Sequence, residues 1–235
     1  MISVSLEAQR NEVLSRLIEA RLTLDLIIQL EAAPPAQDNP TVLSLRGLFF
    51  VHLYACLEFA VNLATQRVLT LISAYEVEYR HFSPRFHVVS MAGGFMAIRD
   101  AGRGKKWSKR IEFVDQIFSE NKCVVSAAVF SDELQNVWVK TISELFDCLG
   151  IDAPPLPDMA YAGHIDAIVD KRNAVAHGRK SASEVAAGSR SPVLKRNWEI
   201  VSETIEHIFN TLTDYLDSYQ FIAAPARATY EAKQV

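Results

Sequence analysis

Apolar residues recur at helical spacing along most of the chain, and this pattern predicts a protein built from α-helices. Residues 4–32 carry leucine and isoleucine three and four positions apart, which is typical of an amphipathic helix. The expected buried stripe of this helix consists of Leu14, Leu17, Ile18, Arg21, Leu24 and Ile28. Prolines stop the helix, and Pro40 suits the first turn of a second one that runs to about residue 74. Because this second helix is apolar almost all round, we expect it at the centre of the fold.

The remaining pattern predicts further helices around one irregular segment. Residues 75–106 mix aromatic, glycine and basic residues without sustained periodicity, so we expect short helices and loops there, with room for a small hairpin at Gly93 and Gly94. Helices are predicted over residues 107–120, 131–149, 163–177 and 194–222, with a polar loop at residues 179–193. No repeat or long linker divides the chain. We therefore expect a single all-α domain over residues 1–235, a helical bundle with an irregular insertion at residues 75–120.

The charge balance limits how this protein can bind nucleic acid. The chain has 235 residues, of which 49% are hydrophobic and 22% are charged, so it can bury a substantial core. Its formal net charge is −4 at pH 7, whereas a protein that coats nucleic acid needs a positive field over much of its surface. Any nucleic-acid site must therefore be local.

Cysteine usage and the N-terminal residues predict a cytoplasmic protein. Cys56, Cys123 and Cys148 are odd in number and widely spaced, which gives neither a disulfide framework nor a CxxC metal pattern. Glu7 and Arg10 fall where an export signal would need its apolar run. Polar side chains interrupt the apolar segment at residues 47–72, so we expect a buried core helix and no membrane contact.

Residues 170–178 read DKRNAVAHG and place an arginine where a helix should be apolar. On a helix, the apolar stripe around Arg172 consists of Ile165, Ile168, Val169 and Ala176. A second, polar stripe consists of Asp166, Asp170, Asn173 and His177. A guanidinium keeps its proton, so Arg172 must find an acceptor or face a cavity that holds an anion. Glu58, embedded in the most apolar helix, has the converse requirement. We expect it to restrain Arg172 while one edge of the guanidinium is left for phosphate.

Spacing alone does not identify this stretch as a site. An arginine followed by a histidine after four to six intervening residues also occurs as Arg46 with His52 and as Arg80 with His87. The stretch at residues 172–178 differs by its context, because asparagine follows the arginine, small apolar residues fill the interval and glycine follows the histidine. In this context the passage IDAIVDKRNAVAHG resembles the toxin-type branches of the HEPN superfamily, including the RiboL-PSP-like HEPN proteins. The likeness extends more loosely to LRGLFFVHLYACLEFAVN and to ELFDCLGI.

The resemblance implies a HEPN-like helical bundle that forms a homodimer, places two such motifs in one cleft, and cuts RNA without a metal or other cofactor. Carried onto this chain, Arg172 would hold the scissile phosphate, and His177 would act as the general base or acid. Asn173 would orient the histidine or the phosphate, with Glu58 and Asp170 in support. By family analogy the protein would be the toxin of a toxin-antitoxin or phage-defence system, with a cognate antitoxin as its protein partner.

Basic residues near the motif would supply the local positive charge that RNA requires. Lys171, Arg179 and Lys180 flank the motif, where a solvated helix end is the alternative reading. A second basic segment, residues 99–110, holds six basic residues and Trp107. It suits either phosphate and base contacts or a solvated loop, and it does not match a phosphate-binding P-loop. The other histidines show no metal-ligand spacing, so no metal site is predicted.

Three other functions fit the same residues. Arg172 and Glu58 would form a purely structural pair, with His177 at a helix end, in a protein without a substrate at this place. A non-catalytic HEPN module would bind RNA or a nucleotide, or serve for dimerisation, without turnover. A regulatory or antitoxin-like helical protein would need Arg172 for its core alone. Cleavage assays on variants of Arg172 and His177 separate these functions from a ribonuclease.

Overall fold

The structure, a computed structural model, describes residues 5–33, 36 and 38–231. Regular secondary structure within these residues is helical, and strand-like pairing is confined to two isolated bridges, Glu78 with Lys122 and Phe82 with Ile222. The all-α prediction is confirmed.

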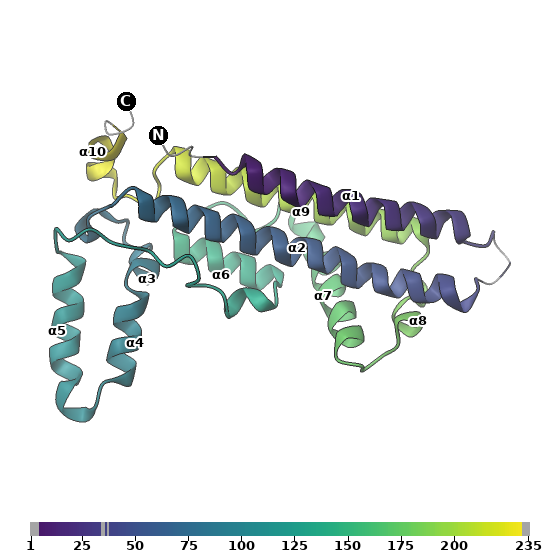
Figure 1. The fold of residues 1–235 in the computed structure, drawn as a ribbon, viewed down its shortest axis with the longest axis horizontal. Helices are drawn as coiled ribbons and strands as arrows, with labels where there is room; N and C mark the ends of the chain where they lie inside the picture. Colours follow the sequence, from purple (N-terminus) through teal and green to yellow (C-terminus); the bar gives the residue numbers. More distant parts are fainter. Residues whose placement is uncertain (1–4, 34–35, 37, 232–235) are drawn as a thin grey trace.

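Three long helices lie side by side and form the bulk of the protein (Figure 1). They are α1 (Glu7–Leu30), α2 (Pro40–Ala74) and α9 (Ser191–Asp217). The shorter helices are α3 (His87–Ser90), α4 (Ala92–Asp100), α5 (Lys106–Ile117), α6 (Val139–Leu149), α7 (Ala162–Ala176), α8 (Ala182–Val185) and α10 (Arg227–Glu231). The first two long helices and the helix before Gly178 have the bounds expected from the sequence to within a few residues, whereas α9 ends five residues earlier than predicted.

Helix α2 is the central element, as its composition predicts. Asn39 caps its first turn by accepting the Val42 N–H at 3.0 Å, and Pro40 occupies the first helical position. α2 contacts α1, α7, α8 and α9, and it buries residues on several sides along its whole length. By length and composition alone α2 could also cross a membrane. Its packing inside the bundle accounts for the apolar composition, which confirms the prediction of a core helix.

The buried face of α1 differs from the predicted stripe. The residues that α1 buries are Val13, Leu17, Ala20, Leu24 and Ile27. Leu14, Ile18 and Ile28, predicted to be buried, are 51%, 52% and 41% exposed. The prediction was wrong because α1 is apolar on two faces, and periodicity cannot tell which of the two packs against α2 and α9.

Residues 75–120 contain the short helices and loops expected at 75–106, with α3 and α4 among them, and the helix expected at 107–120, which is α5. Gly93 and Gly94 lie inside α4 rather than in a hairpin turn, so the hairpin prediction is wrong. A Cβ atom at Gly94 would lie 2.7 Å from the Phe113 ring, which shows that this glycine allows α4 and α5 to pack closely. The pair formed by α4 and α5 points away from the three long helices (Figure 1).

Two other predicted boundaries are wrong, one because of tertiary contacts and the other because of a local capping turn. The helix expected from residue 131 begins only at Val139, because the Tyr54 hydroxyl accepts the Val137 N–H at 3.0 Å and Asp166 accepts the Val139 N–H at 3.1 Å. The loop expected at residues 179–193 contains α8, whose first turn is closed by Ser181 and Glu184 hydrogen-bonding to each other's backbone N–H.

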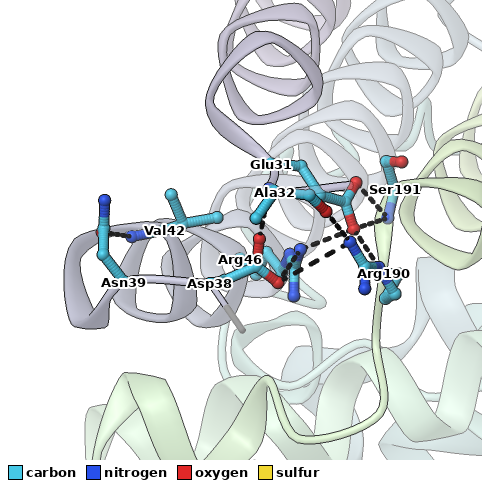
Figure 2. Close-up of polar contacts among 8 residues, drawn as sticks. All are labelled: Glu31, Ala32, Asp38, Asn39, Val42, Arg46, Arg190 and Ser191. Carbon is cyan, nitrogen blue, oxygen red and sulfur yellow. Dashed lines mark hydrogen bonds and ion pairs between the residues drawn. The ribbon is translucent and has the colours of Figure 1, made fainter. Parts of the chain in front are cut away.

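A buried cluster of charges joins the α1–α2 connection to the start of α9 (Figure 2). Arg46 is 2% exposed, and its Nη2 atom lies 2.5 Å from Glu31 Oε1 and 2.7 Å from Asp38 Oδ2. Arg190 donates from Nε to Glu31 at 2.6 Å, and the Ser191 N–H donates to the same carboxylate at 3.2 Å. Two carboxylates thus face two guanidinium groups, so the cluster is neutral and its charges are paired.

The pKa values of both acids in the cluster lie below their ordinary range. Burial alone would raise the pKa of Glu31, but hydrogen bonds from Ser191 and Arg190, with the charge of Arg46, outweigh it. The Ala32 N–H is the main cause of the lowered pKa of Asp38, and Arg46 adds to it. Both carboxylates are therefore ionised at neutral pH, and they hold the start of α9 against the α1–α2 connection.

Candidate active site

The motif helix α7 is seated on the core by its apolar residues and stopped by a glycine. Ile165, Ile168 and Val169 are fully buried. His177 is the C-cap, and Gly178 follows with φ of 65°, a left-handed conformation that favours glycine. The Gly178 N–H donates to the Val175 carbonyl at 3.0 Å, and the Arg179 N–H donates to the Ala174 carbonyl at 2.9 Å, which is the Schellman arrangement. His177 therefore stands at the fixed end of a rigid helix.

Arg172 lies across the helix interface with α2, as expected. Its guanidinium carbon is 4.2 Å from the centre of the Tyr54 ring. Nη1 donates to Asn173 Oδ1 at 2.8 Å, and Nη2 donates to Glu58 Oε2 at 3.3 Å. The side chains of Arg172 and Glu58 are 22% and 27% exposed. The predicted contact between Glu58 and Arg172 is present.

The contacts of Arg172 leave part of its guanidinium available. A guanidinium carries five N–H groups, and two of them are engaged by partners within the described part of the chain. The side chain reaches solvent, so an anion can approach the remaining N–H groups. Arg172 is thus anchored on one side and open on the other, which suits the recognition of a phosphate.

Asn173 connects the arginine to the segment before α6. Its side chain is buried, accepts from Arg172 through Oδ1, and donates through Nδ2 to Asn136 Oδ1 at 3.3 Å. Asn62 on α2 holds the same segment by donating to the Leu134 carbonyl at 3.0 Å. Of the two catalytic candidates, the Asn173 side chain contacts Arg172 and makes no hydrogen bond with the His177 ring. Asn173 therefore fixes the direction of the guanidinium.

Two members of this network were absent from the sequence prediction. Tyr54 lies one helical turn before Glu58, so the four-residue spacing on α2 could have indicated it. Asn136 is 37 positions from Asn173, and no local pattern connects the two.

Burial changes the ionisation of the acid in this network. It raises the pKa of Glu58 above its ordinary value, although the charge of Arg172 and the Tyr54 hydroxyl act against the shift. Burial also raises the pKa of Tyr54, so its hydroxyl stays protonated at neutral pH. The ion pair between Glu58 and Arg172 is therefore less favourable than its charges suggest, and an anionic ligand can compete with Glu58 for the guanidinium.

His177 is exposed and has no side-chain hydrogen bond to any residue that the structure describes. It lies five positions after Arg172, which corresponds to about 140° around a helix axis. Within one chain the imidazole therefore leaves α7 in a different direction from the guanidinium. Asp170, expected to support the pair, is also exposed.

A family model described as RiboL-PSP-HEPN matches residues 12–218. The match spans α1 to α9 and includes Glu58, Arg172 and His177. The chain belongs to the RiboL-PSP-HEPN family. No curated protein and no solved structure gave a match to it.

The three cations that flank the motif of this RiboL-PSP-HEPN chain lie in two different settings. Arg179 and Lys180 are exposed and directly follow Gly178. Lys171 is half-buried, donates to Ser189 Oγ at 2.8 Å, and sits 4.0 Å from the centre of the Phe50 ring. Burial lowers the pKa of Lys171. Arg179 and Lys180 are thus free to meet a polyanion beside His177, whereas Lys171 is held against α2.

The other two arginine–histidine spacings in this RiboL-PSP-HEPN chain do not form a comparable site. Arg46 is enclosed in the charge cluster of Figure 2. Arg80 pairs with Glu78 at 2.9 Å and with Glu120 at 2.8 Å. Arg46 and Arg80 thus each face two carboxylates, whereas Arg172 faces one, Glu58.

Proposed function

We propose that this protein is a metal-independent endoribonuclease with Arg172 and His177 as its catalytic residues. The observation that carries the proposal is the arginine itself, which Glu58, Asn173 and Tyr54 hold in place while part of its guanidinium stays open to an anion. Family membership supports RNA as the source of that anion. His177, exposed at the end of the same helix, provides an imidazole, a side chain that serves as general acid or general base in many enzymes.

The reaction follows from what RNA itself contains. The ribose 2′-hydroxyl attacks the adjacent phosphorus, and the bond from phosphorus to the 5′-oxygen breaks. The products are a 2′,3′-cyclic phosphate and a 5′-hydroxyl. His177 handles one of the two proton transfers, either taking the proton of the 2′-hydroxyl or giving one to the departing 5′-oxygen, and water handles the other. Arg172 neutralises the charge that develops on the phosphate. Since the nucleophile belongs to the substrate, no metal is required to generate it.

A homodimer would complete the site. The guanidinium and the imidazole leave α7 about 140° apart, so one chain alone does not aim both at one phosphate. A twofold arrangement of two α7 helices would bring His177 of one protomer towards Arg172 of the other. Arg179 and Lys180 would line the rim of such a cleft and contact neighbouring phosphates.

The direct test is cleavage of purified total RNA in the presence of EDTA. Wild-type protein should cleave, and both Arg172→Ala and His177→Ala should lose activity while helicity and molecular mass in solution stay unchanged. Cleavage that survives both substitutions, or a strict need for a divalent metal, would overturn the proposal.

We further propose that the protein acts in the cytoplasm as the toxin of a toxin-antitoxin or phage-defence system. Expression of the wild-type chain should then arrest growth, whereas His177→Ala should not. An adjacent gene whose product restores growth and binds this protein would identify the antitoxin partner.

One observation favours a second candidate, a non-catalytic HEPN module that binds RNA or a nucleotide. His177 has no side-chain partner that orients it within the described residues, whereas Arg172 is firmly positioned. This candidate predicts RNA binding without turnover, lost in Arg172→Ala and retained in His177→Ala.

A further inference from the structure

Residues 92–118 form an arm that stands away from the three long helices (Figure 1). α4 and α5 run antiparallel in it and are joined at residues 101–105. The base of the arm is closed by the bridge between Glu78 and Lys122 and by the Cys123 N–H, which donates to the Val77 carbonyl at 2.9 Å. Neither α4 nor α5 contains a buried residue. The arm therefore adds little to the core, and most side chains of α4 and α5 that do not pack between the two helices face solvent.

The tip of the arm, residues 99–110, carries a charge opposite to that of the remaining chain. Of the 24 basic and 28 acidic residues in the sequence, the tip holds six and one, so its net charge is +5 and that of the other residues is −9. Repulsion from an acidic body keeps polyanions away from most of the surface. The tip is the part of the arm that attracts them.

Most of the tip cations are not neutralised by neighbours. Arg99 pairs with Asp100 at 2.8 Å, and Lys109 pairs with Glu112. In the part of the chain that the structure describes, four exposed tip cations have no ion pair: Arg103, Lys105, Lys106 and Arg110. Gly102 and Gly104 have nothing within 4 Å of an added Cβ atom, so the turn between α4 and α5 is uncrowded at both positions.

The exposed aromatic side chains gather on the same arm. Phe95, Trp107 and Phe118 are 48%, 72% and 72% exposed, and elsewhere among the described residues every phenylalanine, tryptophan and tyrosine is buried or half-buried. The Arg110 guanidinium lies 4.8 Å from the Trp107 ring. Of the three rings, Trp107 is the one that lies at the tip, and cations for phosphates beside an open aromatic ring for an unpaired base are the two parts of a site for single-stranded nucleic acid.

We propose that the tip of the arm binds single-stranded RNA, with Trp107 stacking on a base and the four free cations contacting phosphates. The choice of RNA as the strand rests on the proposed ribonuclease function, whereas the binding itself is separate from cleavage. An anionic lipid surface fits less well, because residues 111–120 hold three acidic and no basic residues and would be repelled along most of α5.

The experiment measures binding of a fluorescein-labelled 20-nucleotide oligouridylate by anisotropy at several salt concentrations. All proteins carry His177→Ala, so that the probe is not cut. The tip variant combines Arg103→Ala, Lys105→Ala and Lys106→Ala. A matched control removes the same charge from exposed sites on other elements, with Arg85→Ala, Lys195→Ala and Arg196→Ala.

The tip variant should bind more weakly than the control variant. The slope of log K against log salt, which is negative, should become less steep by about 2, which corresponds to three lost phosphate contacts. Trp107→Ala should weaken binding roughly 5- to 150-fold, and Trp107→Phe should restore most of it. A duplex RNA of equal length should gain nothing from Trp107.

The inference is overturned if the tip and control variants lose affinity equally, or if Trp107→Ala binds as well as the parent. It is also overturned if the protein instead sediments with phosphatidylglycerol vesicles through the tip and binds no RNA. The proposed function stands or falls separately, because cleavage of total RNA by the chain with an unaltered His177 is scored in its own assay. A protein that binds RNA through the tip but does not cleave it would contradict the proposed ribonuclease function and would leave the inference about the arm unchanged.

Discussion

The two motif residues should respond very differently to alanine, because the structure places them in different surroundings. Arg172→Ala removes the partner of a mostly buried carboxylate, Glu58, and the donor to Asn173 Oδ1. Leaving such groups unpaired costs about 1–3 kcal/mol. His177→Ala removes an exposed side chain without a partner in the described structure, and such changes stay within about 0.5 kcal/mol.

These changes in the free energy of unfolding correspond to shifts in melting temperature, and the size of each shift depends on the length of the chain. With 235 residues and an unfolding entropy of about 2.1 cal/mol/K per residue, 1 kcal/mol corresponds to about 2 °C. Arg172→Ala should therefore lower the melting temperature by about 2–6 °C, and His177→Ala by no more than about 1 °C. In contrast, His177→Ala should reduce the rate of RNA cleavage by about 10²- to 10⁴-fold.

The assay combines thermal unfolding followed by circular dichroism with cleavage of a labelled RNA by the same preparations. A stable His177→Ala protein that has lost cleavage supports a chemical role for the imidazole. The reasoning is refuted if His177→Ala unfolds as early as Arg172→Ala, because the histidine would then have a structural role that its exposure excludes. It is equally refuted if His177→Ala cleaves at the wild-type rate.

Four further outcomes are expected. Glu58→Gln should change the melting temperature by no more than about 2 °C, because the cost of burying the carboxylate offsets its attraction to Arg172. The same variant should bind RNA more tightly in a titration, and an unchanged affinity would contradict the competition between Glu58 and phosphate. Arg46→Met should lower the free energy of unfolding in urea by about 3–5 kcal/mol, since it leaves two buried carboxylates with one guanidinium, and a loss below 1 kcal/mol would show that the cluster is not coupled to folding. The lowered pKa of Glu31 contributes stability that is fully present above the pKa of the unfolded state, 4.5, and is lost as pH falls through the pKa of the folded state. The urea concentration at the unfolding midpoint should therefore fall on acidification below pH 4.5, and it should fall less in Glu31→Gln. Gly47→Ala should destabilise the protein by about 1–3 kcal/mol, because its Cβ would lie 1.8 Å from a carbonyl oxygen of α8, and an unchanged melting curve would show that α8 moves freely.

The candidate site shows where reasoning from the sequence succeeds. The pairing of Glu58 with Arg172 follows from the sequence because two charged groups in apolar helices each need a partner, and few are available. The end of α7 before Gly178 follows from the glycine alone, because a residue in the left-handed conformation ends a helix whatever packs around it. The contacts of Asn136 with Asn173 and of Lys171 with Ser189 could not be predicted, because they join segments that only the packing of α7 brings together.

The sequence by itself determined the helical class, the limits of the two first long helices, the central place of α2 and the stretch that holds the candidate site. These properties depend on local spacing, on proline and glycine, and on the motif, all of which act within a few turns of the chain. Only the tertiary structure decided which apolar face of α1 is buried, where α6 begins, and that residues 92–118 project as an arm rather than fold onto the core. The physical reason is the same in each case. An apolar stripe must be buried and a backbone N–H must be hydrogen-bonded, but the packing of helices that are distant in sequence decides which partner each one finds.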